Sequence, residues 1–260
     1  MSPRLIDSVE GFLFDLDGVM YVGGQPIAGA ADTIRFIKDR GYPCRFATNT
    51  TILSNRSLQE KLDRLGLPVE QHEVFGAIRA AQAFLRSRGL PSVHLLVTED
   101  PRRDFDEFPR DDESPDFVVI GDLCKNWDYD TMHRAFHMIV RGAEMLALHK
   151  GRYWQTEEGL RMDIGAFVAG LEYVTGKEAF VIGKPSRAFF DLALADMKLP
   201  ADKVAMVGDD IESDIGGAQA AGMKGILVKT GKYRQELAAA SKVSPDLVID
   251  SVAELTSLLD

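Results

Sequence analysis

The chain has 260 residues, of which 45% are hydrophobic and 27% are charged, a composition typical of an ordinary soluble globular protein. Its formal net charge of −10 argues against a nucleic-acid-binding protein, although a local group of cations could still bind a phosphorylated substrate. Cys44 and Cys124 lie outside any C-x-x-C pattern, so we expect neither a disulfide framework nor a zinc site. No stretch approaches the roughly 20 apolar residues of a membrane helix, and residues 1–10 lack the apolar segment of a signal peptide. We therefore expect a soluble, cytoplasmic protein with no membrane partner.

The N-terminal part of the chain predicts alternating strands and helices. A short apolar run from residue 11 is typical of a strand buried on both faces, and it leads directly into Asp15, Asp17 and Gly18. The segments that follow predict a tight turn or small hairpin at 21–26, a helix at 28–40, a strand at 43–47 and a helix at 54–65. This order is typical of a parallel sheet whose strands are connected by helices.

Asp15 and Asp17 are the most informative residues of this part. Residues two apart in an extended strand point the same way, so both carboxylates would extend from the strand end if the chain stayed extended there. Like charges at about 4 Å repel by about 4 kcal/mol at an effective dielectric constant near 20, which predicts a compensating cation nearby. Taken alone, the pattern is also consistent with an acidic turn in solvent. A calcium-binding loop is disfavoured, because Val19 and Met20 directly follow the glycine.

The rest of the chain predicts an inserted domain and a return to the first one. The middle segment alternates around a charged connection at 99–115, and we expect helices at 76–88, 128–140 and 164–175 and strands at 93–98, 117–120 and 144–149. The last segment predicts strands at 180–182, 203–207, 225–228 and 247–249, helices at 186–197 and 215–221, and a C-terminal helix. We therefore predict an α/β protein with a Rossmann-like, parallel-sheet core at 1–76 and 178–260. A smaller α/β domain is inserted at 77–177.

Four predicted strand ends of the core carry side chains suited to phosphate chemistry. They are Asp15 with Asp17, Thr48 with Asn49, Lys184, and Asp209 with Asp214. Because ligands bind at the carboxyl ends of strands in an open parallel sheet, we expect these residues to meet at one edge. The carboxylates offer hard oxygen ligands, which suit Mg²⁺. Lys184 adds a positive charge, and Thr48 and Asn49 can hydrogen-bond phosphate oxygens.

Short motifs at these four positions resemble those of the haloacid dehalogenase-like (HAD) hydrolases. The motifs are Asp15-Leu16-Asp17-Gly18, Thr48 after an apolar strand, Lys184 in Gly-Lys-Pro, and Gly208-Asp209-Asp210-x-x-x-Asp214. The insertion between the Thr and Lys motifs resembles the C2-type cap of the NagD-like, class IIA branch. Gly-Lys-Pro-Ser and Val228-Lys229-Thr230-Gly231-Lys232-Tyr233 are similar to the subgroup that includes phospholysine phosphohistidine inorganic pyrophosphate phosphatase. The resemblance covers both outer segments of the chain.

The resemblance implies a catalytic role for each matched residue. Asp15 would attack phosphorus and form an aspartyl-phosphate, a covalent route that carboxylates can take. Asp17 would protonate the leaving group and then activate the hydrolytic water. Thr48, with Asn49 beside it, would hold the phosphoryl group, and Lys184 would neutralise it and orient Asp15.

The resemblance also implies Mg²⁺ as the cofactor and a phosphatase activity. The ion would be bound by Asp15, by the backbone carbonyl of Asp17, by Asp209 and, directly or through water, by Asp214, while Asp210 has no assigned role. The implied reaction is hydrolysis of a small phosphorylated metabolite. Three alternatives stay open: a hydrolase of pyrophosphate or of phosphoramidates such as phospholysine and phosphohistidine, a phosphotransferase or mutase, and a phospho-ligand-binding protein without catalysis. Related caps often support dimers, so a homodimer is also an open expectation.

Two other groups of residues carry weaker signals. His133 and His137 lie four residues apart on one predicted helix, a spacing that can hold a metal, but the acidic residue of an H-E-x-x-H site is missing. His149, Arg152 and Tyr153 follow a predicted strand of the inserted domain and could contact substrate. A structural role for these three residues is equally consistent with the sequence.

Overall fold

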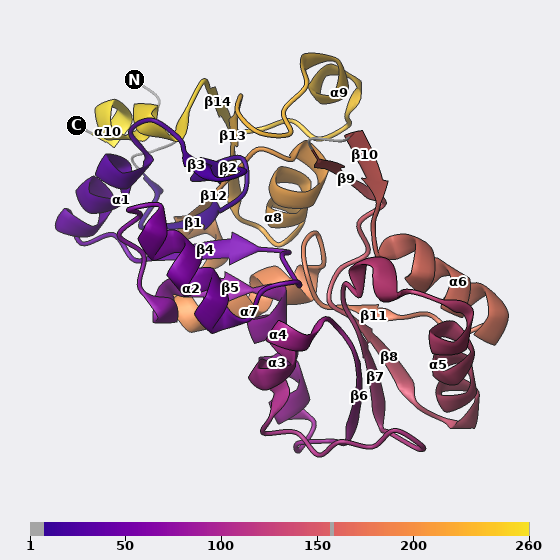
Figure 1. Cartoon of the computed structure of the whole chain (residues 1–260). Helices are drawn as coiled ribbons and strands as arrows, with labels where there is room; N and C mark the ends of the chain where they lie inside the picture. The colour runs from indigo at the N-terminus through magenta and orange to yellow at the C-terminus, as the bar shows by residue number, and fades with distance from the viewer. Residues whose placement is uncertain (1–7, 157–158, 260) are drawn as a thin grey trace. The chain divides into compact units, whose positions relative to one another are not determined.

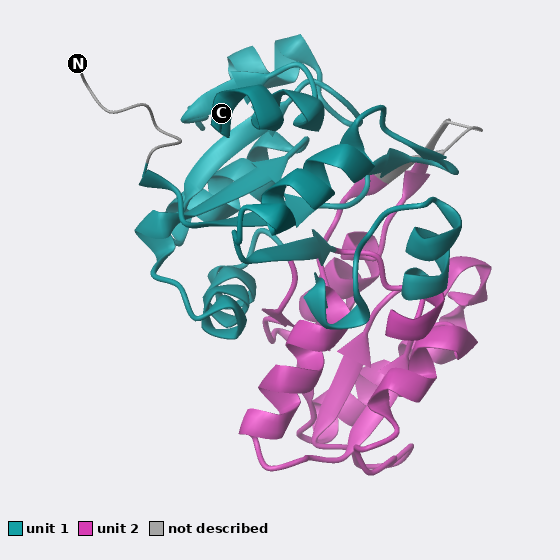
Figure 2. Ribbon diagram, turned by 90° about the vertical axis from the view of Figure 1, so that its left-hand side faces the viewer, with its two compact units in different colours: residues 1–48, 58–76, 184–260 teal, residues 49–57, 77–183 magenta. Residues whose placement is uncertain are grey.

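The computed structural model describes residues 8–156 and 159–259 (Figure 1). The chain forms two compact units, which Figure 2 shows in different colours. Unit 1 comprises residues 1–48, 58–76 and 184–260, and unit 2 comprises residues 49–57 and 77–183. The chain therefore leaves unit 1 and later returns to it. Within the described ranges, no helix is long and apolar enough to cross a membrane.

Unit 1 is built on a six-stranded sheet in which every pair of neighbours is parallel. The strand β1, Gly11–Asp15, is buried along its whole length and pairs with β12, Val204–Gly208, on one side and β4, Cys44–Thr48, on the other. The strand order is β14-β13-β12-β1-β4-β5, where β5 is Val74–Gly76, β13 is Lys224–Val228 and β14 is Leu247–Ile249. Continuous apolar runs form the central strands because both faces of a parallel sheet are covered. The Rossmann-like core predicted from the sequence is confirmed.

Helices connect these strands. α1, Ala30–Asp39, buries Ile34 and Ile37 on one face, as its sequence spacing predicts, and contacts the C-terminal helix α10. α7 contacts α8 and β4. The bounds of the helices of unit 1 after α1 are α2, Asn55–Arg64, which begins in unit 2; α7, Arg187–Met197; α8, Gly217–Ala220; α9, Gln235–Ala240; and α10, Leu255–Leu259.

A small antiparallel hairpin follows β1. Its strands are β2, Tyr21–Val22, and β3, Gln25–Pro26, with Tyr21 paired to Pro26. The sequence predicted a tight turn or a hairpin here, and the hairpin is confirmed.

Unit 2 contains a second parallel sheet, with the order β11-β8-β7-β6. Its strands are β6, Val93–Leu96; β7, Phe117–Ile120; β8, Glu144–Ala147; and β11, Phe180–Val181. The helices of this unit are α3, Ala77–Ser87; α4, Glu99–Arg102; α5, Tyr129–Arg141; and α6, Gly165–Thr175. Apolar side chains of α5 and α6 form one core cluster with those of the sheet, among them Ile139, Val168 and Val118.

The expected position of residues 180–182 in the core sheet is wrong. These residues form β11, which pairs in parallel with β8 of unit 2, so that Phe180 lies opposite Leu146. The backbone N–H of Ile182 then donates to the carbonyl of Ala147 and extends this contact. A two-residue strand is apolar in either sheet, so its sheet membership depends on a partner distant in sequence and not on its own pattern.

The short helix α9 was not expected from the sequence, and neither were three further elements. Residues 74–76 form the edge strand β5, where we expected the beginning of a helix. The helix α4 interrupts the predicted connection at 99–115. An antiparallel hairpin of β9, Tyr153–Thr156, and β10, Gly159–Met162, precedes α6. All three are short, and short elements carry too few periods of a hydrophobic pattern to be recognised.

Carboxylates of unit 2 bind the start of α2. Asp100 accepts hydrogen bonds from the backbone N–H of Ser54 at 2.6 Å and from the hydroxyl of Ser57 at 3.0 Å, and Asp104 accepts from the backbone N–H of Asn55 at 2.9 Å. The N–H of Ser57 donates to the Ser54 hydroxyl at 3.1 Å, so Ser54 caps the start of the helix. These bonds satisfy N–H groups that a helix start leaves unpaired. Residues 49–57 accordingly belong to unit 2, whereas the expected domain boundary placed them in the core.

Removing the Asp100 carboxylate should destabilise the protein. We expect Asp100→Ala to lower the free energy of unfolding by about 1–2 kcal/mol, as the loss of a helix cap does, and the melting temperature by a few degrees. Thermal unfolding followed by circular dichroism measures the effect. Asp106→Ala is the matched control, because Asp106 is exposed and its contact with Arg110 is long, at 3.5 Å. Equal melting temperatures for the two variants would contradict a capping role for Asp100.

Candidate active site

The carboxyl ends of three neighbouring strands of unit 1 carry the predicted site residues. Asp15 is the last residue of β1, Thr48 is the last residue of β4, and Asp209 directly follows β12. Because β12, β1 and β4 are adjacent and parallel, their carboxyl ends lie at the same edge of the sheet. Asp15 and Thr48 are both buried there.

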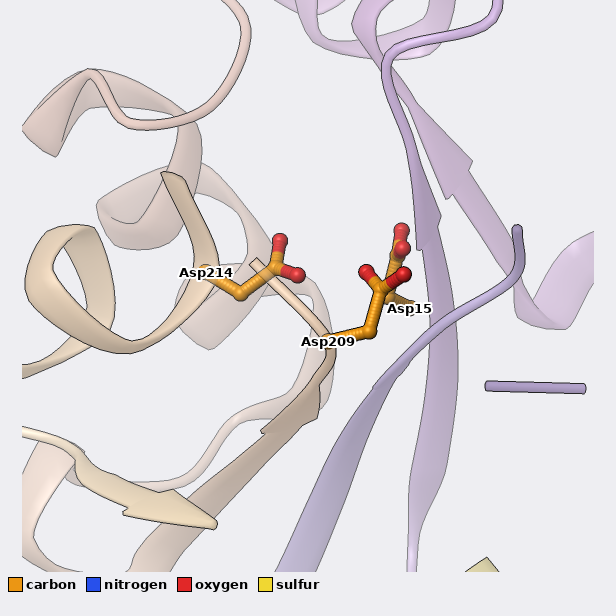
Figure 3. A group of neighbouring side chains, drawn as sticks. All are labelled: Asp15, Asp209 and Asp214. Carbon is orange, nitrogen blue, oxygen red and sulfur yellow. The ribbon is translucent and has the colours of Figure 1, made fainter. Parts of the chain in front are cut away.

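Three aspartates converge at this edge. Asp15, Asp209 and Asp214 each place one carboxylate oxygen within 4.8 Å of the other two, and Figure 3 shows their carboxyl groups drawn together. Asp15 and Asp209 come from strand ends, whereas Asp214 lies in a short π-helix, Ile211–Gly216, that follows β12. All three side chains are buried, with residue exposures of 7%, 2% and 1%. Because three carboxylates are buried close together, their negative charges are costly unless a cation offsets them.

Lys184 supplies a cation to two of the three buried carboxylates. Its Nζ donates to Asp15 Oδ1 at 2.5 Å and to Asp214 Oδ1 at 2.7 Å, and the side chain is 4% exposed. The structure thus brings Lys184 to the carboxylates as expected. The element that carries Lys184 differs from the expected one. Lys184 lies in the loop between β11 and α7 and not at the end of a strand of the core sheet.

The loop after β13 packs directly on the site. The Thr230 hydroxyl donates to the carbonyl of Gly18, and the backbone N–H of Lys232 donates to Asp209 Oδ2 at 2.6 Å. A Cβ on Gly18 or on Gly231 would overlap with Asp209 Oδ2, and both glycines have positive φ, of 89° and 59°. Glycine is therefore required at both positions to let the loops approach the carboxylate. In the sequence, residues 228–233 carried only a family resemblance, and this contact was not predicted.

Asp210 orients the turn that carries Asp214. Its side chain accepts hydrogen bonds from the backbone N–H groups of Glu212 and Ser213 at 3.1 and 3.0 Å, which caps the π-helix. The backbone N–H of Asp210 donates to Asp214 Oδ2 at 3.2 Å. The structure therefore gives Asp210, which the sequence left without a role, a structural one.

Asp17 does not join the buried carboxylates. The strand β1 ends at Asp15, and the chain turns immediately, with the N–H of Gly18 bonded to the carbonyl of Tyr21 at 2.7 Å. The chain therefore does not stay extended beyond Asp15, as it would have to for the Asp15 and Asp17 side chains to point the same way. The carboxylate of Asp17 is exposed and accepts a hydrogen bond from the Tyr21 hydroxyl at 3.0 Å.

The remaining candidates lie in unit 2. Asn49 begins this unit, so its expected contact with phosphate stays a prediction. His133 and His137 are exposed on α5, with their Nε2 atoms 3.1 Å apart. His149 is buried, and its Nδ1 accepts from the backbone N–H of Gly151 at 3.1 Å. In the part of the chain that the structure describes, the aspartate cluster of unit 1 is the group of three or more acidic, His or Cys side chains that converges as a metal site would.

The site has more negative charge than its cations balance. Burial, followed by the charges of Asp15 and Asp214, raises the pKa of Asp209 to about 8. Burial raises the pKa of Asp214 to about 7, and that of Asp15 also rises, in both cases against the opposing charge of Lys184. Burial alone would lower the pKa of Lys184, but the charges of Asp15 and Asp214 outweigh it and keep the ammonium group protonated.

The donor set fits a divalent cation. Asp209 Oδ1 is buried and, among the described residues, has no hydrogen-bond partner, although buried polar atoms are almost always paired. Three carboxylate oxygens within 4.8 Å are hard ligands of the kind that divalent cations with oxygen preference bind. A cation here would pair the unbonded oxygen and offset the excess negative charge.

Known families match both outer segments of the chain. A family described as haloacid dehalogenase-like hydrolase matches residues 12–108, and one described as HAD-hydrolase-like matches residues 181–255. The phospholysine phosphohistidine inorganic pyrophosphate phosphatase of Bos taurus is 38% identical over 257 residues, which cover 96% of this chain and 94% of that protein. This similarity therefore extends over the inserted unit as well.

Solved structures agree with the sequence relatives. The 4-nitrophenylphosphatase of Thermotoga maritima has a TM-score of 0.93 at 27% identity, covering 99% of this chain and all of that one. NagD from E. coli K-12 has a TM-score of 0.87 at 26% identity, covering 95% of this chain and 98% of that one. Phosphatases of known structure thus share the architecture of this chain along nearly its whole length. The chain belongs to the haloacid dehalogenase-like hydrolase family, in its NagD-like class IIA branch.

Proposed function

We propose that this phosphohydrolase is a Mg²⁺-dependent phosphatase that hydrolyses a small phosphorylated metabolite through an aspartyl-phosphate on Asp15. One observation carries the proposal above the others. A buried carboxylate at a strand end, Asp15, is held by a buried lysine that also bonds Asp214, beside an Asp209 oxygen that has no protein partner in the described chain. This arrangement presents one oriented nucleophile together with a set of oxygen ligands.

In the first step, Asp15 acts as the nucleophile. One of its carboxylate oxygens forms a bond to phosphorus while the bond between phosphorus and the leaving oxygen breaks, and the leaving oxygen takes a proton from Asp17. Lys184 donates to Asp15 Oδ1, which fixes the orientation of the carboxylate. Its charge also offsets that of the incoming phosphate, which a carboxylate would otherwise repel.

In the second step, water attacks the phosphorus of the aspartyl-phosphate. Asp17, now ionised, takes a proton from this water, and Asp15 is released as a carboxylate. The exposure of Asp17 suits both steps, because it must exchange protons with the leaving group and with water. Thr48, at the end of the adjacent strand β4, is proposed to hydrogen-bond the phosphoryl oxygens, with Asn49 next to it.

Asp15, Asp209, Asp214 and the backbone carbonyl of Asp17 would hold the metal ion. The choice of Mg²⁺ follows from the all-oxygen donor set and from the phosphate substrate. When bound, Mg²⁺ would supply positive charge to the transferring phosphoryl group. The loop from Thr230 to Lys232 and the Asp210 cap keep the carboxylates in place for it.

The substrate is proposed from the relatives and from the order of the two units along the chain. Unit 2 is proposed to act as the cap that selects the leaving group, because the chain crosses between the units directly after Thr48 and directly before Lys184. Relatives with similar coverage are named for pyrophosphate and phosphoramidate substrates and for 4-nitrophenyl phosphate. We propose a small phosphomonoester as the substrate. The main alternative is pyrophosphate, phospholysine or phosphohistidine at the same site.

A substrate panel should establish the leaving group. We expect phosphate release from several phosphomonoesters with Mg²⁺ and its loss with excess EDTA. Pyrophosphate and phospholysine belong in the same panel, and a preference of tenfold or more in kcat/KM for either would favour the alternative. Tight binding of phosphate compounds without any release would instead identify a binding protein.

Replacing the nucleophile should abolish turnover while the fold is kept. We expect Asp15→Asn to lower kcat by more than about 10³-fold, because the amide cannot form the covalent intermediate. The matched control, Asp39→Asn, changes an exposed aspartate of α1 and should retain wild-type kcat. Circular dichroism verifies that both variants are folded, and near-normal turnover by Asp15→Asn would remove Asp15 from the mechanism.

The effect of Mg²⁺ on stability should depend on pH. The pKa values of about 8 for Asp209 and about 7 for Asp214 lie above the ordinary value of 3.8, so in metal-free protein the unfolded state loses these protons first. The free energy of unfolding should therefore fall as the pH rises from about 4 to about 8. Since Mg²⁺ binds ionised carboxylates, its stabilisation should grow over the same window, from little at pH 5 to several degrees in melting temperature at pH 8.5.

Melting curves with EDTA and with saturating Mg²⁺ test this dependence. Asp209→Asn should show a shallower pH dependence without metal and a reduced response to Mg²⁺. Asp32→Asn, an exposed aspartate paired with Arg35, is the matched control and should behave as wild type. A Mg²⁺ effect of the same size at pH 5 and pH 8.5 would argue against metal binding by the buried carboxylates.

A further inference from the structure

The side chains of Asp17 and Tyr21 are hydrogen-bonded to each other on the turn after β1. The Tyr21 hydroxyl donates to Asp17 Oδ2 at 3.0 Å, across four residues of sequence. The turn between them is tied by backbone hydrogen bonds from Gly18 N–H to the Tyr21 carbonyl at 2.7 Å and from Met20 N–H to the Leu16 carbonyl at 2.9 Å. An exposed carboxylate is thus bonded to a side chain at a fixed place in the same turn.

Tyr21 itself is immobilised by its surroundings. The residue is fully buried, and it pairs with Pro26 in the β2–β3 hairpin. The Nζ of Lys61 on α2 lies 3.9 Å from the centre of its ring, a cation–π contact within unit 1. The position of the hydroxyl is therefore set by the core and by the hairpin.

The Tyr21 hydroxyl can serve Asp17 only as a hydrogen-bond donor. A phenol has an ordinary pKa of about 10, so it keeps its proton at neutral pH. A neutral phenol facing a carboxylate donates its proton to the hydrogen bond without releasing it. Tyr21 is thus unsuited to be the proton source of the reaction.

We propose that Tyr21 is a positioning residue for the acid–base step, holding Asp17 by Oδ2 so that Oδ1 is the oxygen that carries and transfers the proton. The inference rests on the proposed function, in which Asp17 protonates the leaving oxygen. An exposed aspartate otherwise samples several rotamers, and only some of them point toward the substrate. A fixed donor restricts this rotation and keeps the acid in the geometry that proton transfer requires.

The inference predicts that loss of the Tyr21 hydroxyl depends on the leaving group. Alkoxide leaving groups are strongly basic and need protonation as they depart, whereas 4-nitrophenolate is a stable anion and needs little. For Tyr21→Phe we expect kcat/KM to fall about 10-fold or more with alkyl phosphates and less than about 3-fold with 4-nitrophenyl phosphate. The ratio kcat/KM is the right quantity, because it reports the step in which the leaving group departs and not the later hydrolysis of the aspartyl-phosphate.

The variant should fold, because phenylalanine keeps the ring, its packing and the contact with Lys61. The Asp17 carboxylate that loses the hydroxyl is exposed and can be hydrated instead. Tyr42→Phe is the matched control: this tyrosine also belongs to unit 1, and its ring packs edge-on against Phe12 in β1, three residues before Asp15. We expect Tyr42→Phe to retain wild-type kcat/KM with every leaving group.

A double-mutant comparison separates positioning from a structural role. In the Asp17→Asn background the carboxylic acid is gone, so adding Tyr21→Phe should cause no further loss with alkyl phosphates. A loss by Tyr21→Phe that is equal for all leaving groups, or one that adds fully to that of Asp17→Asn, would overturn the inference and leave the proposed function standing. If Asp17→Asn alone lowered kcat/KM equally for every leaving group, the acid role of Asp17 in the proposed function would itself be overturned.

Discussion

The confinement of three carboxylates and one ammonium group at a buried strand end is the constraint on which the rest of the site depends. Two like charges at about 4 Å repel by about 4 kcal/mol even at an effective dielectric constant near 20. Lys184 bonds Asp15 and Asp214 and leaves Asp209 with an unbonded, buried oxygen in the described structure. The elevated pKa values of Asp209 and Asp214 express this imbalance in the metal-free state. A divalent cation bound by these carboxylates would offset the imbalance, so the electrostatics of the site favour such an ion.

The surroundings of the carboxylates are arranged to hold them despite this repulsion. The buried parallel strands β1 and β12 fix the backbone of Asp15 and Asp209, while the Asp210 cap fixes the turn that carries Asp214. Gly18 and Gly231 lack the Cβ that would exclude Asp209, and their positive φ angles belong to tight loops. The buried strands and the hydrogen-bonded loops therefore both hold the carboxylates in fixed positions.

Much of this site could be predicted from the sequence because its main parts depend on local patterns. Apolar runs that end in Asp15, Thr48 and Asp209 mark buried strands, and parallel strands necessarily bring their carboxyl ends together. The source of Lys184 could not be predicted, because the sheet that β11 joins depends on pairing with the distant strand β8. The contact of Lys232 N–H with Asp209 is equally non-local. The separation of Asp17 from Asp15 depends on where β1 ends, and strand ends are poorly specified by sequence patterns.

The different environments of Asp15 and Asp17 suit the two roles that the proposed mechanism gives them. A nucleophile benefits from burial, because a fixed, poorly hydrated carboxylate is ready to attack once its charge is balanced by Lys184. An acid–base group must instead reach a leaving oxygen and a water molecule in turn, so it has to remain accessible. An exposed side chain by itself has no fixed orientation. The hydrogen bond from the buried Tyr21 hydroxyl orients the Asp17 carboxylate while leaving it exposed. Two carboxylates separated by one residue can therefore take opposite roles because the chain turns between them and the second is held from the hairpin side.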